Sequence, residues 1–257
     1  MSAIRLGTRA STLATTQSEM VAGLLRSEGL DVNLTTITTH GDTSTASLAA
    51  MGGIGVFASA IRAALLEGEA DIAVHSFKDL PTGRPLGLAI GAVPARADPR
   101  DALVARDGLT LHDLPQEASV GTGSPRRAAQ LLAVRPDLTI VDIRGNVDTR
   151  LGRVKGLGRY AKNGGKEDLD AVVLAASGLA RLGHSGAVTE FLDPSVVLPA
   201  PAQGALAVEC RTADSRHGKL AKALARIDDR RTRLAATAER AVLSHLEAGC
   251  AAPIGAL

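Results

Sequence analysis

The chain has 257 residues, of which 45% are apolar and 2% aromatic, and its 29 Lys and Arg nearly balance its 27 Asp and Glu. A formal net charge of +2 and so few aromatic rings argue against a dedicated nucleic-acid binder, which needs a basic surface or a platform for stacked bases. No apolar run approaches the roughly 18 residues of a membrane helix, and two cysteines are too few for a disulfide-stapled fold, so we expect a cytoplasmic protein of two or three domains with no membrane partner.

Short β-rich runs alternate with helical patterns in the first part of the chain. Strands are predicted at Ile4–Thr8, Val32–Thr38 and Ala70–Val74, and helices over about Thr12–Glu28 and Phe57–Glu67. Gly29 and Gly68 follow the two helices and are typical stop residues. This alternation is typical of βαβ units built around a parallel sheet.

The segment 41–57 separates the second strand from the second helix and is rich in Gly, Ser and Thr, with a single charge at Asp42. Such a composition orders poorly by itself. A mobile lid over a binding site and an ordinary surface loop are equally good interpretations of it.

A turn-rich, charged stretch, Pro94–Asp101, precedes a second set of strands, and we interpret it as a crossing between domains. The strands are predicted near Ala118–Gly121, Leu138–Ile143 and Asp170–Ala175, each followed by a helical segment. The proline-containing segment Val196–Gln203 leaves no room for a helix and should carry the chain back to a strand at Ala205–Glu209. Two α/β lobes joined by two crossings predict a ligand cleft.

Apolar residues follow helical spacing from Asp229 to Leu246, so a further element begins there. One amphipathic helix with a short tail cannot enclose a core, and this part either packs on the lobes or starts a truncated domain, which we favour. The predicted organisation is 1–97 with 204–224 as the first lobe, 98–203 as the second, and 225–257 as the start of a third domain.

The segment Val120–Arg127 (VGTGSPRR) lies between a predicted strand and a predicted helix. Ser124 fits the N-cap of that helix and Pro125 its first position. Free backbone N–H groups beside Arg126 and Arg127 would hold a carboxylate or phosphate. A capped helix with solvated arginines explains the same residues about equally well.

Further cations follow the predicted strands, where ligands of open α/β sheets bind. They are Arg9, Lys78, Arg144, Arg150 and Arg181. Cations that converge on one site repel one another unless an anion with several charges lies between them, and arginine suits carboxylates. A polycarboxylate ligand is therefore the best fit.

Three other side chains bear on the chemistry. Asp79 lies among these bases and would stabilise a cationic intermediate as a buried acid, although pairing with Lys78 or capping a turn is the commoner role of such a residue. Cys250 lies on a glycine-bounded loop that an electrophile can reach, whereas Cys210 ends a strand and should be buried and inert. The histidines show no metal-ligand spacing, so we expect no metal site.

Taken together, five motifs closely resemble the porphobilinogen deaminase family, also called hydroxymethylbilane synthase. They are Arg5–Arg9, Asp71–Pro81, Val120–Arg127, Arg144–Arg150 and Leu246–Cys250. The resemblance implies an α/β fold of two lobes like periplasmic binding proteins and a third small α+β domain, apparently truncated here. One departure is Gly123, where the family usually carries a second serine before the paired basic residues.

The resemblance also implies a transferase that polymerises four porphobilinogen molecules into the linear tetrapyrrole hydroxymethylbilane and releases ammonia. Asp79 would be the catalytic residue, and Cys250 would hold a covalent dipyrromethane cofactor through a thioether. Residues implied to bind the cofactor are Ser76, Lys78, Thr122, Ser124, Arg126, Arg127, Arg144, Gly145 and Gln203, and those implied to bind the substrate are Arg9, Arg144, Arg150 and Arg181.

We expect porphobilinogen as the partner of a monomeric protein. A non-catalytic anion-binding protein with the same lobes would need the cations but neither Asp79 nor Cys250, and it would carry an export signal. Met1–Gly7 lacks the basic start and apolar core of such a signal. A nucleic-acid binder that used the arginines is the remaining alternative, and it predicts a steep salt dependence.

Overall fold

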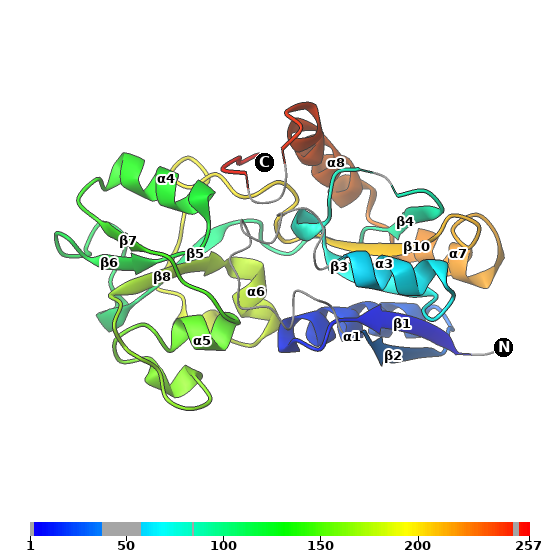
Figure 1. Cartoon of the computed structure of the whole chain (residues 1–257), viewed down its shortest axis with the longest axis horizontal. Helices are drawn as coiled ribbons and strands as arrows, with labels where there is room; N and C mark the ends of the chain where they lie inside the picture. The colour runs from blue at the N-terminus through cyan, green and yellow to red at the C-terminus, as the bar shows by residue number, and fades with distance from the viewer. Residues whose placement is uncertain (1–2, 38–57, 84, 249–251) are drawn as a thin grey trace. The chain divides into compact units, whose positions relative to one another are not determined.

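The structure is a computed structural model that describes residues 3–37, 58–83, 85–248 and 252–257. The chain divides into two compact units, 1–97 with 205–251 and 98–204 with 252–257. It leaves the first unit after Ala97 and returns to it at Ala205 (Figure 1). Residues 225–248 group with the first unit, and their assignment to a third domain stays a prediction.

The first unit contains a mixed five-stranded sheet in the order β2-β1-β3-β10-β4. Its strands are β1 (Ile4–Thr8), β2 (Val32–Thr36), β3 (Ile72–Ser76), β4 (Leu88–Ala92) and β10 (Leu206–Arg211). Strands β1, β2 and β3 are parallel, but β10 runs antiparallel to both β3 and β4. The prediction of a parallel sheet, made for the strands between Ile4 and Val74, is confirmed for β1, β2 and β3, whereas the sequence predicted no direction for β10.

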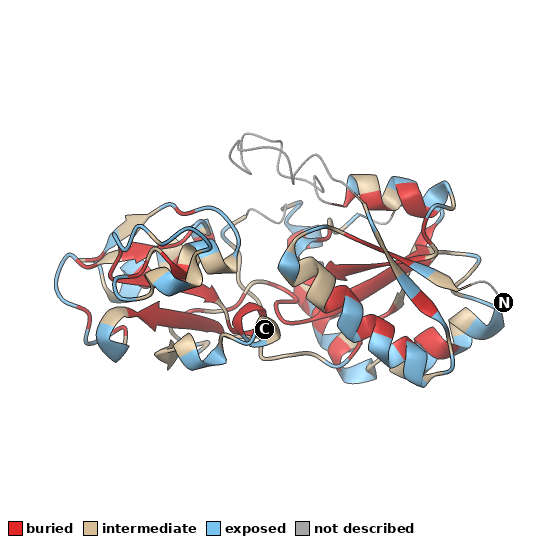
Figure 2. Cartoon of the chain, turned by 90° about the horizontal axis from the view of Figure 1, so that it is seen from below, coloured by how far each residue is buried: buried red, intermediate tan, exposed pale blue. Residues whose placement is uncertain are grey.

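Four helices of the first unit are described beside this sheet. They are α1 (Thr12–Ser27), α3 (Ser59–Leu66), α7 (Gly218–Ile227) and α8 (Arg230–His245). Helix α1 begins where the Ser11 side chain accepts a hydrogen bond from Ala14 N, and it is followed by Gly29 at φ 80°. Leu6, Val21 and Val208 are fully buried between sheet and helices, and Figure 2 shows the buried residues on the strands and inner helix faces.

The second unit repeats the pattern, with strands in the order β7-β6-β8-β5-β9. Its strands are β5 (Asp101–Ala105), β6 (Ser119–Gly121), β7 (Thr139–Val141), β8 (Ala171–Ala175) and β9 (Glu190–Phe191). Strands β6, β7 and β8 are parallel, whereas β5 is antiparallel to β8 and β9.

Three α-helices follow the parallel strands of the second unit, as predicted: α4 (Pro125–Val134), α5 (Val147–Leu151) and α6 (Ala176–Arg181). Short 3-10 turns cover Arg106–Gly108, Gly158–Tyr160 and Ser185–Ala187. Successive residues of β5 pack into opposite cores, Leu103 into one and Val104 into the other. Both faces of the sheet are therefore covered, which explains its almost continuous apolar strands.

Candidate functional site

A buried network of charges lies at the start of helix α4 in the second unit. Asp101, which is fully buried, accepts hydrogen bonds of 2.7 Å from Nη2 of Arg126 and 2.7 Å from Nη2 of Arg127. Burial raises the pKa of the Asp101 carboxyl, but the Arg127 and Arg126 charges outweigh it and lower the pKa to about 2. The interpretation of these arginines as solvated side chains is wrong, because they are 4% and 6% exposed.

Gln203 joins this network from the segment that ends the second unit. Its Nε2 donates 2.8 Å hydrogen bonds to Asp101 Oδ1 and to the Pro99 carbonyl oxygen. Arg126 Nη1 also donates to the Leu198 carbonyl oxygen. The network thus links the first strand of the unit to its last segment, and it holds both guanidinium groups in fixed positions.

The loop before α4 has the predicted local geometry with one difference. Ser124 is the N-cap residue and Pro125 the first helical residue, but the Ser124 hydroxyl makes no capping hydrogen bond. Its backbone N–H instead donates to Thr122 Oγ1 at 3.2 Å. A Cβ atom on Gly123 would lie 2.7 Å from the Ile143 carbonyl oxygen, so the loop passes close to the end of β7.

Arg150, on α5, lies near two other predicted site residues of the second unit. Its Nε donates a 2.8 Å hydrogen bond to the carbonyl oxygen of Gly145, whose φ is 101°. Burial lowers the pKa of Arg150, and the Arg127 and Arg144 charges lower it further, against the opposing charge of Asp142. The structure therefore brings Arg127, Arg144 and Arg150 together despite their mutual repulsion.

Two arginines of this unit have buried N–H groups that can donate hydrogen bonds to a ligand. Arg181, on α6, donates from Nη2 to the Gly204 carbonyl oxygen at 2.7 Å, and burial lowers its pKa to about 10. The Nε atoms of Arg127 and Arg181 are buried and find no hydrogen-bond partner among the described residues. Buried N–H groups are rarely left unpaired in a functional protein, and a carboxylate is a suitable acceptor.

The predicted residues of the first unit follow two adjacent parallel strands, β1 and β3. Arg9, which is half-buried, follows β1, and Ser76 ends β3 with its hydroxyl donating to Gln17 Oε1 at 3.1 Å. A 3-10 turn over Phe77–Asp79 comes directly after, with Lys78 half-buried. Because parallel strands end at one edge of a sheet, Arg9 and Ser76 lie at the same edge.

Asp79 is exposed, and the prediction of a buried acid is therefore wrong. The reason is local: β3 ends at Ser76, and the turn takes the chain out of the sheet before it reaches Asp79. An exposed carboxylate beside Lys78 is directly accessible to a ligand. Water would be excluded from Asp79 only when a bound ligand or a lid covers it.

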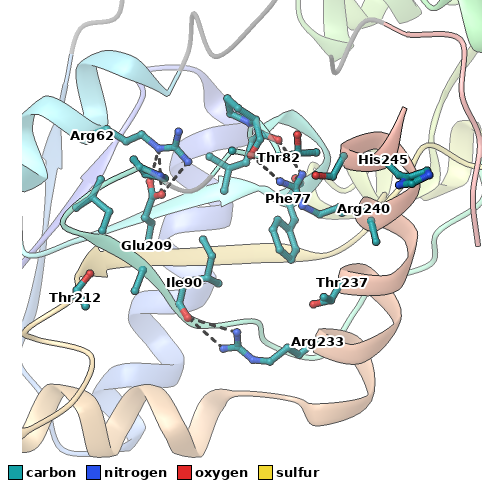
Figure 3. A pocket seen from close by; sticks show the side chains of 18 residues that line it. Arg62, Phe77, Thr82, Ile90, Glu209, Thr212, Arg233, Thr237, Arg240 and His245 are labelled. Carbon is teal, nitrogen blue, oxygen red and sulfur yellow. Dashed lines mark hydrogen bonds and ion pairs between the residues drawn. The ribbon is translucent and has the colours of Figure 1, made fainter. Parts of the chain in front are cut away.

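Arg240, on α8, is a further residue of interest that was not predicted to belong to the site. Figure 3 shows it pointing from α8 across an open hollow of about 990 Å³ towards the turn after β3. Its guanidinium donates to the carbonyl oxygens of Phe77 and Leu80 at 2.8 Å each and of Pro81 at 2.7 Å. Helical spacing predicts α8, but nothing in the sequence indicates which carbonyl groups this arginine binds.

The two cysteines differ in what the structure describes of them. Cys210, on β10, is fully buried, and burial raises the pKa of its thiol to about 11, which confirms it as an unreactive residue. Cys250 and the segment 41–56 lie outside the described residues. Within the described ranges, no group of three or more His, Cys, Asp or Glu is placed to hold a metal ion, and no helix is long and apolar enough to cross a membrane.

Solved structures resemble this fold at low sequence identity. A nutrient binding protein from Burkholderia cenocepacia bound to methionine has a TM-score of 0.50 at 16% identity, over 86% of this chain and 91% of that chain. YehZ from Escherichia coli has a TM-score of 0.50 at 14% identity, over 97% of this chain and 95% of that one. These likenesses concern the fold alone, and they confirm the prediction of two α/β lobes like those of periplasmic binding proteins.

Comparison with known sequences is more specific. The porphobilinogen deaminase from Micrococcus luteus is 57% identical over 276 aligned residues, which cover all of this chain and 73% of that protein. Those from Leifsonia xyli and Mycobacterium avium are 59% and 56% identical over 99% of this chain and 75% and 76% of theirs.

Two family models match separate parts of the chain. Residues 4–219 match the dipyromethane cofactor binding domain of porphobilinogen deaminase, and residues 233–257 match its C-terminal domain. The two matches together include every residue that the sequence motifs single out. The chain therefore belongs to the porphobilinogen deaminase family.

Proposed function

We propose that the chain is a transferase that joins four porphobilinogen molecules head to tail into hydroxymethylbilane, releasing ammonia, in tetrapyrrole biosynthesis. The observation that carries this proposal is the family match over nearly the whole chain, which includes both Asp79 and Cys250. The grouped arginines of the second unit support it, since porphobilinogen carries two carboxylates and its polymers carry more.

The residues present fit a dipyrromethane cofactor. Such a group bears several carboxylates. In the second unit the buried Nε atoms of Arg127 and Arg181 have no hydrogen-bond partner among the described residues and can donate to them. We propose that Cys250 Sγ forms the thioether and that the carboxylates are bound by Ser76, Lys78, Thr122, Ser124, Arg127 and Arg144, with Gly145 shaping the loop. When bound, the cofactor supplies the terminal pyrrole carbon to which the chain is added.

Two of the predicted cofactor ligands have an indirect role in this proposal. Arg126 and Gln203 both donate to Asp101, so their polar atoms are directed into the protein. We assign them to holding Arg127 in place and to adding positive charge. Arg9, Arg144, Arg150 and Arg181 are assigned to the carboxylates of the substrate and of the growing product.

Asp79 is the proposed catalytic residue. Its carboxylate would accept hydrogen bonds from pyrrole N–H groups and stabilise the positive charge that develops on the pyrrole and its methylene carbon as the amino group of porphobilinogen leaves as ammonia. Exposure of Asp79 on the turn after β3 leaves it accessible to the substrate.

We further propose that the protein acts as a cytoplasmic monomer. The near balance of charges, 29 basic against 27 acidic residues, supports an enzyme for a small anionic substrate in place of a nucleic-acid partner. Sedimentation of the purified protein at micromolar concentration tests the monomer, and a dimer there would contradict it.

The test of the function combines intact mass, a pyrrole colour reaction and an assay of ammonia release. The purified protein should carry the added mass of two linked pyrrole units and should release ammonia from porphobilinogen. Cys250→Ser should lose both the added mass and the activity. Cys210→Ser is the matched control, because that thiol is fully buried in β10, and it should keep both. An active protein with unmodified Cys250 would contradict the proposal.

A further inference from the structure

The turn that carries Asp79 is short. It is a single 3-10 turn, Phe77–Asp79, and its internal backbone hydrogen bond, from Leu80 N to Phe77 O, is long at 3.4 Å. Phe77 N donates to the Ala205 carbonyl oxygen at 3.0 Å, which fixes the start of the turn to the chain that leads into β10. Contacts from other parts of the first unit therefore contribute to the position of the residues after Phe77.

Arg240 supplies those contacts from helix α8. One guanidinium group donates to three carbonyl oxygens, those of Phe77, Leu80 and Pro81, at 2.7 to 2.8 Å. The same group lies over the Phe77 ring, with Cζ 4.5 Å from the ring centre. The bound carbonyl groups flank Asp79 on both sides, so one planar, rigid donor fixes both ends of the segment that carries the carboxylate.

Helix α8 is itself firmly attached to the first unit. Asp228, just before the helix, accepts a 2.7 Å hydrogen bond from Val93 N. Within the helix, Thr232 Oγ1 accepts from Arg96 N at 3.0 Å, and the buried Glu239 accepts from Arg96 Nη2 at 2.9 Å. Arg240 follows Glu239 directly, and its side chain therefore projects from a helix whose position is fixed at several points.

We propose that Arg240 is a positioning residue that holds the Asp79 carboxylate in its working place. It contacts no substrate in this proposal. It fixes the turn that carries Asp79 to α8, the helix that precedes Cys250 in the sequence. The kinetic test of this inference rests on the proposed function, because it measures turnover of porphobilinogen. The structural test does not, because the geometry of the turn can be measured without substrate.

The kinetic test uses Arg240→Lys and Arg240→Ala, with Arg231→Ala as the matched control, because Arg231 is an exposed arginine of the same helix. We expect Arg240→Lys to lower kcat about 10- to 100-fold with KM within about threefold, since small displacements of a catalytic group cost rate and leave binding intact. Guanidinium ion added to Arg240→Ala should restore part of kcat, and Arg231→Ala should match the unaltered protein. An unchanged kcat in Arg240→Lys, or a rise in KM at constant kcat, would overturn the proposal.

The structural test is amide hydrogen exchange over Phe77–Leu80 in the same variants. In Arg240→Lys these amides should exchange at least about tenfold faster, while the amides of β3 remain as protected as in the unaltered protein. Equal exchange rates in the turn would overturn the inference even if activity fell. If the unaltered protein releases no ammonia, the proposed function fails, and the exchange experiment still decides whether Arg240 fixes the turn.

Discussion

Asp101 Oδ1 lies 2.7 Å from Arg127 Nη2, and the carboxylate is fully buried while the arginine is 6% exposed. The pair joins the first residue of β5 to the third residue of α4, elements that lie 26 positions apart in the sequence. Because Arg126 contacts the other oxygen, one carboxylate pairs with two cations inside the second unit. The stability of this unit and the position of its arginines therefore depend on the same residue.

Asp101→Asn should strongly destabilise the second unit. The amide keeps the shape but removes the charge, so two buried guanidinium groups lose their counterion, which typically costs about 3–5 kcal/mol. The free energy of unfolding from urea titration measures the effect. Asp107→Asn is the control, because its side chain is 69% exposed and pairs with Arg106 at the surface, where we expect less than about 1 kcal/mol. Equal effects of the two substitutions would contradict the prediction.

The same carboxylate predicts a pH dependence of stability. Its pKa is lowered from 3.8 to about 2 in the folded protein, so its stabilising contribution is complete above roughly pH 4–5 and is lost as the pH falls through about 2. The shift corresponds to roughly 2 kcal/mol. The difference in unfolding free energy between the unaltered protein and Asp101→Asn should therefore shrink by about that amount between pH 5 and pH 2. A constant difference over this range would contradict the low pKa.

A polycarboxylate should stabilise the cofactor-free protein. Citrate between Arg127, Arg144 and Arg150 would relieve their repulsion, and we expect Cys250→Ser protein to unfold roughly 3–6 °C higher in millimolar citrate than in sodium chloride of equal ionic strength. Adding Arg144→Ala should remove at least half of this rise, whereas Lys166→Ala, at an exposed site outside the arginine group, should leave it intact. An equal rise in both variants would show that citrate acts elsewhere.

A close approach of two glycines predicts a packing defect in the second unit. A Cβ atom on Gly165 would lie 1.7 Å from the Gly152 carbonyl oxygen, so Gly165→Ala must push the two segments apart. We expect a loss of about 1–3 kcal/mol or more in the free energy of unfolding. Gly186→Ala is the control, since nothing lies within 4 Å of its added Cβ, and its stability should change little.

Asp79→Asn should lower the rate of ammonia release about 10²- to 10⁴-fold, because the amide cannot neutralise a developing positive charge. The KM for porphobilinogen should stay within about threefold, since the arginines bind the carboxylates. Steady-state kinetics with Asp31→Asn, another exposed aspartate of the first unit, provide the comparison. A variant that turns over at the unaltered rate would exclude the proposed role of Asp79.

The strands and helices with regular patterns were predictable from the sequence. Strands β1, β2, β3 and β10 have bounds within two residues of those predicted, as do β6, β7 and β8. Helix α7 was missed although Leu220, Ala223, Leu224 and Ile227 follow helical spacing, so its signal was present. Strands β4 and β5 were missed because they adjoin the turn-rich stretch Pro94–Asp101, and β9 was missed because it has only two residues.

The types of residue in the site could be predicted from the sequence, but their hydrogen-bond and ion-pair partners could not. Arginines after strands indicate an anion site, and the structure places Arg127, Arg144 and Arg150 near one another. Asp101 was not predictable as a site residue, because it lies 25 residues from Arg126 and 102 from Gln203 and falls in a stretch with the pattern of a charged turn. Such contacts depend on the mixed strand order, which local propensity does not encode.

The position of β10 has a consequence for the order in which the protein forms. This strand lies between β3 and β4, so the sheet of the first unit lacks its connecting strand until residue 211 has left the ribosome. The segment 98–204, by contrast, contains all five strands of the second sheet in one stretch. During synthesis the second unit can therefore complete its sheet before the first unit, although the ribosome starts with the first unit.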